Sequence, residues 1–281
     1  MATSRTDGKS PLTGRVIVIS GAGRGIGLAT ARRLIGTGAR VVLLDRDAGV
    51  HEAAAGLGDR AAAFTVDVTD AGAMTAVMDE VAARHGGIDA VVANAGISGP
   101  NATVESVDPA AFERVVEVNL LGVWRTVRAA LPHVRARRGY ILMTSSIAAA
   151  IPCPTVAGYA ASKAGIEAFG RALRIELAHT GTQVGIAYFG AVDTELVRGL
   201  ITRPALREGL EKMPRRLGAP IPVDRAGAAM AGGVERRART VYAPWWVPAL
   251  LAVRAQLAMA DPLAARIPAL ARLIEDTGKP G

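Results

Sequence analysis

The chain has 281 residues, half of them hydrophobic, and a formal net charge of +8. This length suits one large α/β domain, and this apolar content excludes an intrinsically disordered chain. The single cysteine, Cys153, excludes an internal disulfide framework, and the four histidines show no metal-ligand spacing, so we expect no metal site. Most of the positive charge lies after residue 200, without a DNA-binding motif or an aromatic-interleaved basic groove, so we expect no nucleic-acid partner.

The first fifteen residues contain no apolar core and no cleavage pattern, so we do not expect a signal peptide and expect a cytoplasmic protein. After them, short apolar runs alternate with segments of helical spacing. The runs are Val16–Ser20, Val41–Asp45, Ala62–Val68, Asp89–Gly96, Tyr140–Ser146 and Gln183–Gly190. The helical segments include Ala29–Ile35, Met74–Arg84, Ala110–Arg137 and Ala160–Ala178. Runs that are apolar throughout are typical of strands covered on both faces, so the pattern predicts a right-handed, parallel α/β sheet with helices on both sides.

The turn after the first predicted strand is rich in glycine, with Gly21, Gly25 and Gly27 in SGAGRGIG. Glycine allows a tight turn and lets backbone N–H groups approach a diphosphate, and the N-terminus of the following helix adds partial positive charge. The spacing is a variant of the dinucleotide-binding fingerprint. Its position after the first strand favours a nucleotide site over an ordinary strand-to-helix turn.

Asp45 ends the second predicted strand. A carboxylate there accepts hydrogen bonds from both adenosine ribose hydroxyls and repels the 2′-phosphate of NADP, which favours NAD. Arg24 and Arg46 favour the alternative, because each could bind a 2′-phosphate. Asp67 and Val68, after the third strand, are expected at the adenine; in the alternative interpretation Asp67 caps the next helix.

Tyr159 and Lys163 lie four residues apart at the start of a predicted helix, which places them on one face, one turn apart. An isolated pair of this kind would be an ordinary surface contact. However, an adjacent ammonium stabilises a phenolate and lowers its pKa from the usual value of about 10. A lowered pKa suits proton exchange with an alcohol near neutral pH, so this pair is a candidate acid–base centre.

Taken together and in order, these motifs resemble those of the short-chain dehydrogenase/reductase family. The matching features are Ser20–Gly27, Asp45, Asp67, Asn94–Gly96 (NAG), Asn119 in VNLLG, Ser145-Ser146 and Tyr159–Lys163 (YAASK). The resemblance implies a three-layer Rossmann fold, with a doubly wound parallel sheet of about seven strands, as a single domain over residues 1–243. Ala238–Pro244 would then supply the last strand.

The resemblance also implies roles for single residues. Tyr159 resembles the catalytic acid/base, and Lys163 the residue that holds the nicotinamide ribose and depresses the tyrosine pKa. Ser146 resembles the serine that hydrogen-bonds the substrate oxygen, and Asn119 the residue that positions a relay water. The implied cofactor contacts are Gly21, Arg24, Gly25, Ile26, Gly27, Asp45, Arg46, Asp67, Val68, Asn94, Ala95, Gly96, Tyr159, Lys163, Gly190, Val192 and Thr194. Phe189 stands where the family has proline, which leaves the turn freer and adds a ring near the cofactor.

Residues 195–222 are expected to form a substrate lid. Its apolar residues are Leu196, Val197, Leu200, Ile201, Leu206, Leu210, Met213 and Leu217, and the loop Ile147–Gly158 adds Ile151, Pro152, Pro154 and Val156. Such walls suit an apolar secondary alcohol or ketone, unless these side chains only pack the lid. The predicted function is an NAD-dependent oxidoreductase that interconverts such a pair. The alternatives are an NADP-dependent carbonyl reductase and a non-catalytic nucleotide-binding or membrane-attached scaffold.

Residues 244–281 depart from the family pattern and are expected to form an amphipathic helical extension. Leu263, Ile267, Leu270 and Ile274 are spaced as one helical face, after two tryptophans and with Arg254, Arg266 and Arg272 nearby. This face could pack on the domain, on a second subunit or over the substrate pocket, or it could contact an anionic membrane peripherally. We expect a homodimer or homotetramer built on Ala110–Arg137 and Ala160–Ala178.

Overall fold

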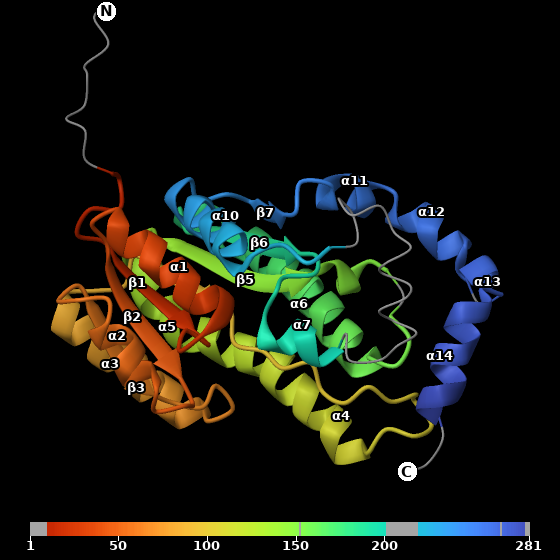
Figure 1. Ribbon diagram of the computed structural model, residues 1–281. Helices are drawn as coiled ribbons and strands as arrows, with labels where there is room; N and C mark the ends of the chain where they lie inside the picture. The colour runs from red at the N-terminus through yellow and green to blue at the C-terminus, as the bar shows by residue number, and fades with distance from the viewer. Residues whose placement is uncertain (1–9, 152, 201–218, 265, 279–281) are drawn as a thin grey trace, which may run out of the picture.

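The computed structural model describes residues 10–151, 153–200, 219–264 and 266–278. Its centre is a parallel sheet of seven strands in the order β3-β2-β1-β4-β5-β6-β7 (Figure 1). The strands are β1 (Val16–Ser20), β2 (Arg40–Asp45), β3 (Ala61–Thr65), β4 (Ala90–Ala93), β5 (Tyr140–Ser146), β6 (Gln183–Phe189) and β7 (Thr240–Ala243). The predicted sheet is thus confirmed, although β3 ends at Thr65 and leaves Asp67 and Val68 in the turn beyond it.

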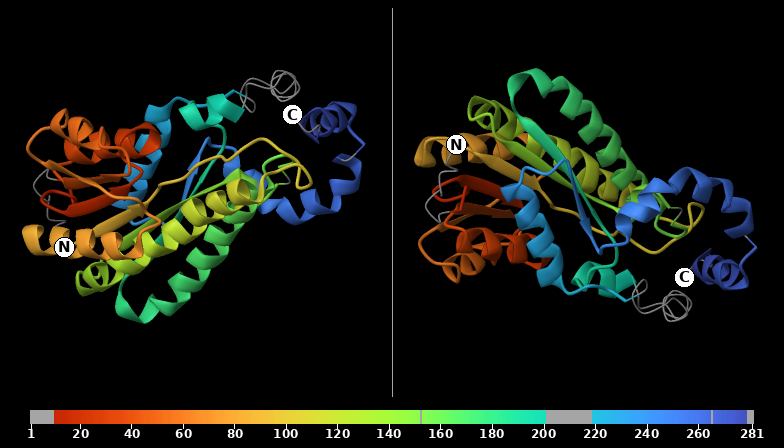
Figure 2. Two further views of the ribbon diagram at one scale, coloured as in Figure 1. Left: turned by 90° about the horizontal axis from the view of Figure 1, so that it is seen from below. Right: turned by 90° about the horizontal axis from the view of Figure 1, so that it is seen from above.

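Helices cover both faces of the sheet, as the uniformly apolar strands require (Figure 2). One layer consists of α1 (Gly25–Gly36), α2 (Val50–Ala55) and α10 (Val223–Glu235), whose buried side chains share a core with one face of the strands. The other layer consists of α3 (Ala71–His85), α5 (Gly122–Ala136) and α6 (Ala157–Glu176), over a second core. The fold is therefore a three-layer Rossmann architecture.

The strand order reverses between β1 and β4, since the chain builds the sheet outward from β1 through β2 and β3 and then returns. The loops that follow β1 and β4 consequently leave the sheet in opposite directions and open a crevice at the carboxyl ends of the strands. The glycine turn follows β1, and Asn94–Gly96 follows β4. The topology thus brings two motifs more than seventy residues apart in the sequence to the same edge of the sheet.

The long helix expected over residues 110–137 is interrupted. It consists of α4 (Pro109–Val116), a π-helical turn over Glu117–Leu121, and α5. Asn119 lies in the π-helical turn, is fully buried, and exchanges two hydrogen bonds with the backbone of Ile97. The side chain thus bonds to a neighbouring loop at the point where the helix widens, which is typical of a π-bulge at a functional site.

In its described residues, 244–264 and 266–278, the C-terminal extension forms a row of short helices that leaves the sheet after β7. They are α11 (Val247–Ala252), α12 (Arg254–Met259), α13 (Asp261–Ala264) and α14 (Pro268–Gly278). The expectation of one continuous helical face was wrong, because Leu263 belongs to α13 while Leu270 and Ile274 belong to α14. Pro268 explains the break, since a proline disfavours helical geometry at the preceding residue, here Ile267. Within the described ranges, every helix is too short or too polar to cross a membrane.

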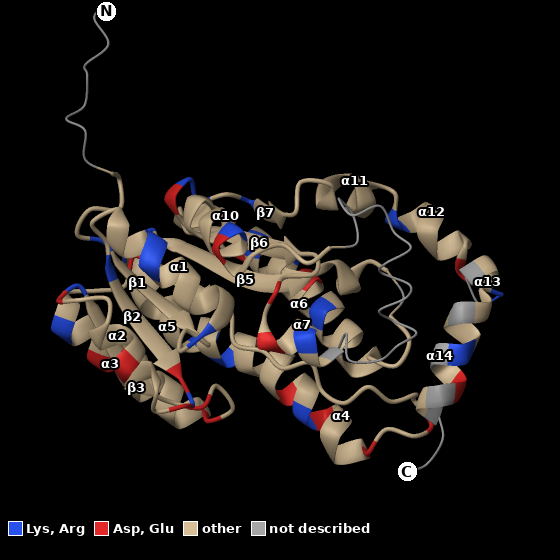
Figure 3. Cartoon of the chain, viewed as in Figure 1, with Lys and Arg blue, Asp and Glu red and all other residues tan. Residues whose placement is uncertain are grey.

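Charged side chains are interspersed over the surface. Figure 3 shows Lys and Arg next to Asp and Glu along α4 and α3 and around the carboxyl edge of the sheet. Several of them form ion pairs, including Arg125 with Glu117 at 2.7 Å and Arg15 with Asp89 at 2.8 Å. The net charge of +8 is therefore not gathered into one basic stripe on the side shown.

Gly185 in the middle of β6 offers a sharp test of the packing between the sheet and the loop before β7. A Cβ at this position would collide with the Tyr140 hydroxyl and the Ala238 carbonyl oxygen, which are joined by a hydrogen bond of 2.7 Å. Gly185→Ala is therefore expected to lower the free energy of unfolding by about 2–3 kcal/mol, because it overpacks a buried site and breaks this bond. Urea unfolding of the variant and the parent measures this difference.

The matched control is Gly36→Ala at the end of α1, where a Cβ meets no atom within 4 Å. This exchange should leave stability within about 0.5 kcal/mol or raise it slightly, since alanine is the better helix former. Equal effects of the two substitutions would contradict the packing described for β6.

Candidate active site

An open cleft of about 820 Å³ runs along the carboxyl ends of the strands. Nearly every residue expected at a cofactor or substrate lines it: Gly21, Arg24, Gly25, Ile26, Asp45, Arg46, Asp67, Val68, Asn94, Ala95, Gly96, Ser146, Tyr159, Lys163, Gly190, Val192 and Thr194. Gly27 and Asn119 do not line it. The fold thus collects residues from seven regions of the sequence on one surface.

The glycine turn is shaped so that only glycine fits. Gly21 and Gly25 have φ values of +63° and +57°, and a Cβ at Gly21 would lie 2.7 Å from the Cα of Ala95. Gly27 does not line the cleft, so its expected contact with the cofactor stays a prediction. A Cβ there would collide with the carbonyl oxygen of Gly21, so Gly27 allows α1 to pack directly against the turn. The resulting surface, with backbone N–H groups at the start of α1, suits a diphosphate.

Asp45 lies against this turn. Its Oδ2 accepts a hydrogen bond of 2.9 Å from the backbone N–H of Gly23, and its Oδ1 accepts one of 3.2 Å from Asp47. Arg24, the possible 2′-phosphate ligand, instead pairs with Glu195 of α7 (Glu195–Leu200) at 2.8 Å. The adenosine end of the cleft therefore presents a fixed carboxylate beside an arginine that already has an acidic partner.

Asp67 has a partner that the sequence analysis missed. Its Oδ2 pairs with Nη2 of Arg114 on α4 at 3.1 Å, and its Oδ1 accepts a bond of 2.9 Å from the backbone of Thr69. Partial burial alone raises the pKa of Asp67, but the bonds from Thr69 and Arg114 hold it below the usual value. The alternative of a helix cap was wrong, since Asp70 caps α3. Arg114 also lines the cleft, so the adenine end carries both charges.

Asn94 joins three strand ends at the floor of the cleft. Its Nδ2 donates to the backbone oxygens of Ser20 and Gly21 at 3.2 and 3.1 Å, and its Oδ1 accepts from Thr144 at 3.3 Å. The ends of β1, β4 and β5 are thereby held together. The amide explains why a polar residue follows a fully apolar strand at this position.

Tyr159, Lys163 and Ser146 meet beyond this floor. Tyr159 is the third residue of α6, and Lys163, one turn later, is 4 % exposed. The Lys163 Nζ donates to the carbonyl oxygen of Thr144 at 2.9 Å and lies 5.5 Å from the centre of the Tyr159 ring. Ser145 donates to the Lys163 carbonyl oxygen, and the Ser146 hydroxyl donates to the Phe189 carbonyl oxygen at 3.4 Å. Ser146 is the serine of β5 that interacts with Tyr159 and opposes the rise of its pKa.

Burial dominates the titration of this pair. It raises the pKa of Tyr159 above its usual value, and the hydrogen bond from Ser146 only partly opposes the change. The expectation of a depressed tyrosine pKa was therefore wrong for this structure, since the apolar surroundings disfavour the phenolate. Burial also lowers the pKa of Lys163 from 10.5 to about 8.

The lowered pKa of Lys163 predicts a dependence of stability on pH. The unfolded chain binds this proton more tightly than the folded one, so the cost of burying the ammonium is largest below pH 8 and vanishes as the pH rises toward 10.5. Between pH 7 and 10 the parent is expected to gain on the order of 1–2 kcal/mol relative to Lys163→Met, which has no charge to lose. Urea unfolding of both proteins across this range measures the gain, and parallel curves would contradict it.

Asn119 lies behind the cleft. Its Oδ1 accepts from the Ile97 N–H at 2.8 Å, and its Nδ2 donates to the Ile97 oxygen at 2.9 Å and to Ser162 at 3.2 Å. Ser162 in turn donates to the Tyr159 carbonyl oxygen at 2.7 Å. Asn119 therefore connects the loop after β4 to the first turn of α6, where Tyr159 lies.

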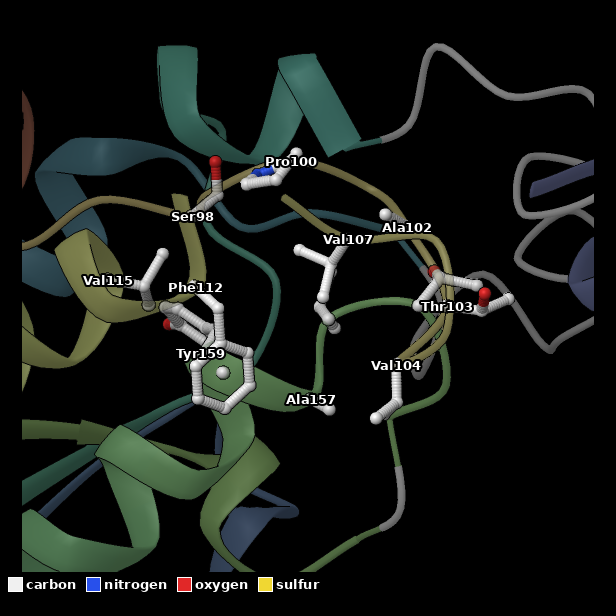
Figure 4. Close-up of a pocket in the computed structure, with 13 residues that line it drawn as sticks. Ser98, Pro100, Ala102, Thr103, Val104, Val107, Phe112, Val115, Ala157 and Tyr159 are labelled. Atoms are coloured by element: carbon white, nitrogen blue, oxygen red, sulfur yellow. The ribbon is translucent and has the colours of Figure 1, made fainter. Parts of the chain in front are cut away.

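A small pocket of about 20 Å³ borders Tyr159 (Figure 4). The loop over residues 98–107 forms most of its wall, together with Phe112 and Val115 of α4 and residues 155–159. The figure shows Val107, Phe112 and Val115 around the Tyr159 ring, with Thr103 and Val104 at the far side. The sequence analysis missed this apolar wall, because nothing in the pattern of residues 98–107 indicates what they face.

The other expected pocket residues are placed only in part. Of the lid, Leu196 and Val197 in α7 line the cleft, whereas Ile201, Leu206, Leu210, Met213 and Leu217 lie outside the described residues, as does Pro152. Val156 lines the small pocket. Cys153 is a free, partly buried thiol, and burial raises its pKa to about 11. Phe189 lines the cleft but is 4 % exposed, with most of its ring in the core.

A doubly wound parallel sheet, with a glycine turn at its switch point and a Ser–Tyr–Lys cluster lining the same cleft, is typical of an oxidoreductase that uses a nicotinamide dinucleotide. Within this class, the chain belongs to the short-chain dehydrogenase/reductase family, whose model (short chain dehydrogenase) matches residues 15–204. It is accordingly an NAD(P)-dependent enzyme that acts on CH–OH groups.

Three relatives illustrate the similarity. The cis-4-hydroxycyclohexanecarboxylate dehydrogenase of Sinomonas cyclohexanicum is 41 % identical over 190 residues, which are 66 % of this chain and 76 % of the relative. The L-fucose dehydrogenase of Rattus norvegicus is 32 % identical over 229 residues, 78 % of this chain and 83 % of the relative. The crystal structure of the 3-ketoacyl-(acyl-carrier-protein) reductase from Brucella melitensis, complexed with NADH, has a TM-score of 0.75 at 30 % identity and covers 83 % of this chain and 97 % of that one.

Proposed function

We propose that this enzyme oxidises an apolar secondary alcohol to its ketone with NAD, and catalyses the reverse reduction. The observation that carries the proposal is the convergence of Tyr159, Ser146 and Lys163 at the end of the dinucleotide cleft, next to the apolar wall of the small pocket. A protein that only binds nucleotides has no need of a half-buried tyrosine beside a buried lysine at this place. The reaction is proposed to take place in the cytoplasm.

The chain's own residues divide the work of proton transfer. Bound NAD supplies the hydride acceptor at its nicotinamide, and the protein supplies alignment. In alcohol oxidation the Tyr159 oxygen takes the hydroxyl proton while Ser146 donates a hydrogen bond to the substrate oxygen. The Lys163 ammonium would move from the Thr144 carbonyl toward the nicotinamide ribose and favour the phenolate, offsetting the burial that raises the pKa of Tyr159. Asn119 holds the first turn of α6 in place and would position the relay water.

The preference for NAD over NADP is proposed on the position of Asp45. Its carboxylate is fixed by two backbone N–H groups at the end of β2, where ribose hydroxyls bind and a 2′-phosphate would be repelled. Arg24 is engaged with Glu195, which weakens the case for an NADP-dependent carbonyl reductase. Arg46 is exposed and could bind a 2′-phosphate, so the enzyme is assayed with NADP as well as with NAD.

The proposed substrate is a compact apolar ring or chain that carries a secondary hydroxyl. Val107, Phe112 and Val115 support its apolar character, since they line a small pocket of about 20 Å³ that borders Tyr159, at the edge of the larger cleft. The relative named for a hydroxylated cyclohexane ring makes cyclohexanols the first compounds to test, and the relative named for L-fucose makes that sugar the polar competitor. A panel of cyclic and acyclic secondary alcohols with NAD and with NADP, followed by absorbance of the reduced nicotinamide, decides among them. Turnover of L-fucose alone would contradict the apolar substrate.

We also propose that the enzyme is a homodimer or homotetramer that pairs through α5 and α6. Trp124 on α5 and Ile175 on α6 are large apolar side chains that are 38 % and 78 % exposed. The double substitution of Trp124 and Ile175 by glutamate is expected to shift the mass to that of one chain, because it places charge in the interface. Light scattering on a sizing column measures the mass. The control is Val104→Glu, at an apolar residue outside α5 and α6 that is about as exposed as Ile175. A parent that is already monomeric would contradict the proposal.

A further inference from the structure

The C-terminal extension begins directly behind the active site. A Cβ at Gly190, which lines the cleft, would lie 3.0 Å from Pro244 Cδ and 3.4 Å from Trp246 Cη2. Val247 is fully buried in a small core with Ile186 and Tyr188, against which Ile147, Tyr242, Trp246 and Leu251 pack. Ile147 immediately follows Ser146. The first turn of the extension therefore supports the ends of β5 and β6, which carry candidate site residues.

An ion pair then ties the extension to α6. Arg254, the first residue of α12, contacts Glu167 with 2.5 Å between Nη1 and Oε1. The Glu167 side chain is only 10 % exposed, lies one turn beyond Lys163, and is also hydrogen-bonded to Tyr188. A carboxylate at this depth needs a cation, because an unpaired buried charge is strongly destabilising. Arg171 is more distant, at 3.7 Å, so Arg254 is the close partner.

The far end of the extension returns to the wall of the small pocket. The Ser106 hydroxyl donates to the carbonyl oxygen of Thr277 in α14 at 3.2 Å. The Ser106 hydroxyl also accepts a hydrogen bond from the backbone N–H of Thr103, which lines the pocket. The backbone N–H of Ala102, the residue before Thr103, donates to the carbonyl oxygen of Thr155 at 2.9 Å. Thr155 lies four residues before Tyr159. Figure 1 shows the result, an arc from β7 through α11, α12 and α13 to α14, which ends beside the loop before α4.

We propose that this arc is an outer wall of the substrate-binding region and that the Arg254–Glu167 pair holds it in place, so that the extension limits the size of the alcohol that reaches Tyr159. The inference rests on the proposed function and extends it to specificity. In it, Arg254 is a positioning residue, since it contacts α6 and not the substrate. Loosening the pair should admit bulkier alcohols, because the wall of residues 98–107 loses the support of α14.

The alternative role for the C-terminal extension is contact with a membrane. Trp245, Met259 and Leu263 are 76 %, 83 % and 65 % exposed, so an anionic membrane could take them up. A membrane anchor, however, does not require the nearly buried Glu167 carboxylate, which fixes α12 to the helix that carries Tyr159 and Lys163. The observed contacts favour a wall, and binding to vesicles becomes an outcome of the test.

The test compares Arg254→Gln and Glu167→Gln with the control Arg266→Gln, at an exposed arginine of the same extension. Each full-length protein is assayed with NAD on cyclohexanol and on a cyclohexanol that bears a bulky 4-substituent. In the first two variants, kcat/KM for the bulky alcohol relative to the compact one is expected to rise at least about fivefold. The change should lie in KM, with kcat for cyclohexanol within about twofold of the parent and NAD affinity unchanged. The control should match the parent.

Amide hydrogen exchange separates a failure of the wall from a failure of the proposed function. If the parent oxidises neither alcohol, the proposed substrate class is wrong, while faster exchange of residues 99–107 in Arg254→Gln still supports the wall. Unchanged exchange in this segment, or an unchanged ratio in an active enzyme, overturns the inference. Flotation of the parent with vesicles of anionic phospholipid, with no change in exchange in Arg254→Gln, would also overturn it in favour of a membrane contact.

Discussion

Tyr159→Phe is expected to reduce kcat by ~10²–10⁴-fold while leaving the affinity for NAD within about twofold. The substitution removes one oxygen atom and keeps the ring, which packs beside Phe112 and Val115 in the wall of the small pocket. Only the proposed acid/base is lost, because Ser146 can hydrogen-bond the substrate oxygen but its hydroxyl is a far weaker acid than a phenol and does not replace it in proton transfer. Steady-state kinetics in both directions and fluorescence titration with NADH measure the two quantities.

The control for this experiment is Tyr242→Phe. Tyr242 in β7 stacks on Tyr188 with ring centroids 5.9 Å apart and does not line the cleft. Loss of its hydroxyl should leave kcat within about twofold of the parent. Residual turnover of Tyr159→Phe above a tenth of the parent rate would remove Tyr159 from the mechanism, whereas a parallel loss of NADH binding would indicate a structural role.

The second large effect is expected at Asp45. Asp45→Ser should raise the ratio of kcat/KM with NADP to that with NAD by ~10–100-fold, since it removes the charge that repels a 2′-phosphate and the acceptor that binds the ribose hydroxyls. Exposed Arg46, the next residue, would then be free to pair with the phosphate. The ratio is measured on one alcohol with each cofactor at several concentrations.

Asp47→Ser is the matched control, because Asp47 is an exposed carboxylate two residues further along the same turn. It should change the cofactor ratio by less than about threefold, since its Oδ1 bonds to Gly49 and not to the glycine turn. A parent that already prefers NADP would contradict the proposed role of Asp45 and restore the carbonyl-reductase alternative.

Much of the fold was predictable because its signals are local. Val16–Ser20, for instance, is apolar at its first four positions and is followed by glycines that suit a tight turn. Both the strand and its loop could therefore be predicted. Tyr159 and Lys163 could be paired from the sequence, because helix geometry alone places residues four apart on one face. The structure places them together on α6.

Other features depend on contacts that no local pattern encodes. The direction of the Tyr159 pKa was mispredicted, because burial depends on everything packed around the ring and not on the lysine one turn away. The Arg114–Asp67 pair joins residues 47 apart in sequence, and the Arg254–Glu167 pair joins residues 87 apart. The local sequence around Arg114 or Arg254 does not distinguish either residue from the arginines that stay exposed on the surface.

The sequence by itself therefore determined the class of fold, the dinucleotide turn and the candidate reactive residues, since these follow from hydrophobic periodicity, glycine geometry and helical spacing. Only the tertiary structure decided where the extension lies and which residues wall the space beside Tyr159. An amphipathic segment specifies that one of its faces will be covered but not by what. Long-range packing and ion pairs such as Arg254–Glu167 make that choice, and their energy exists only once the chain has folded.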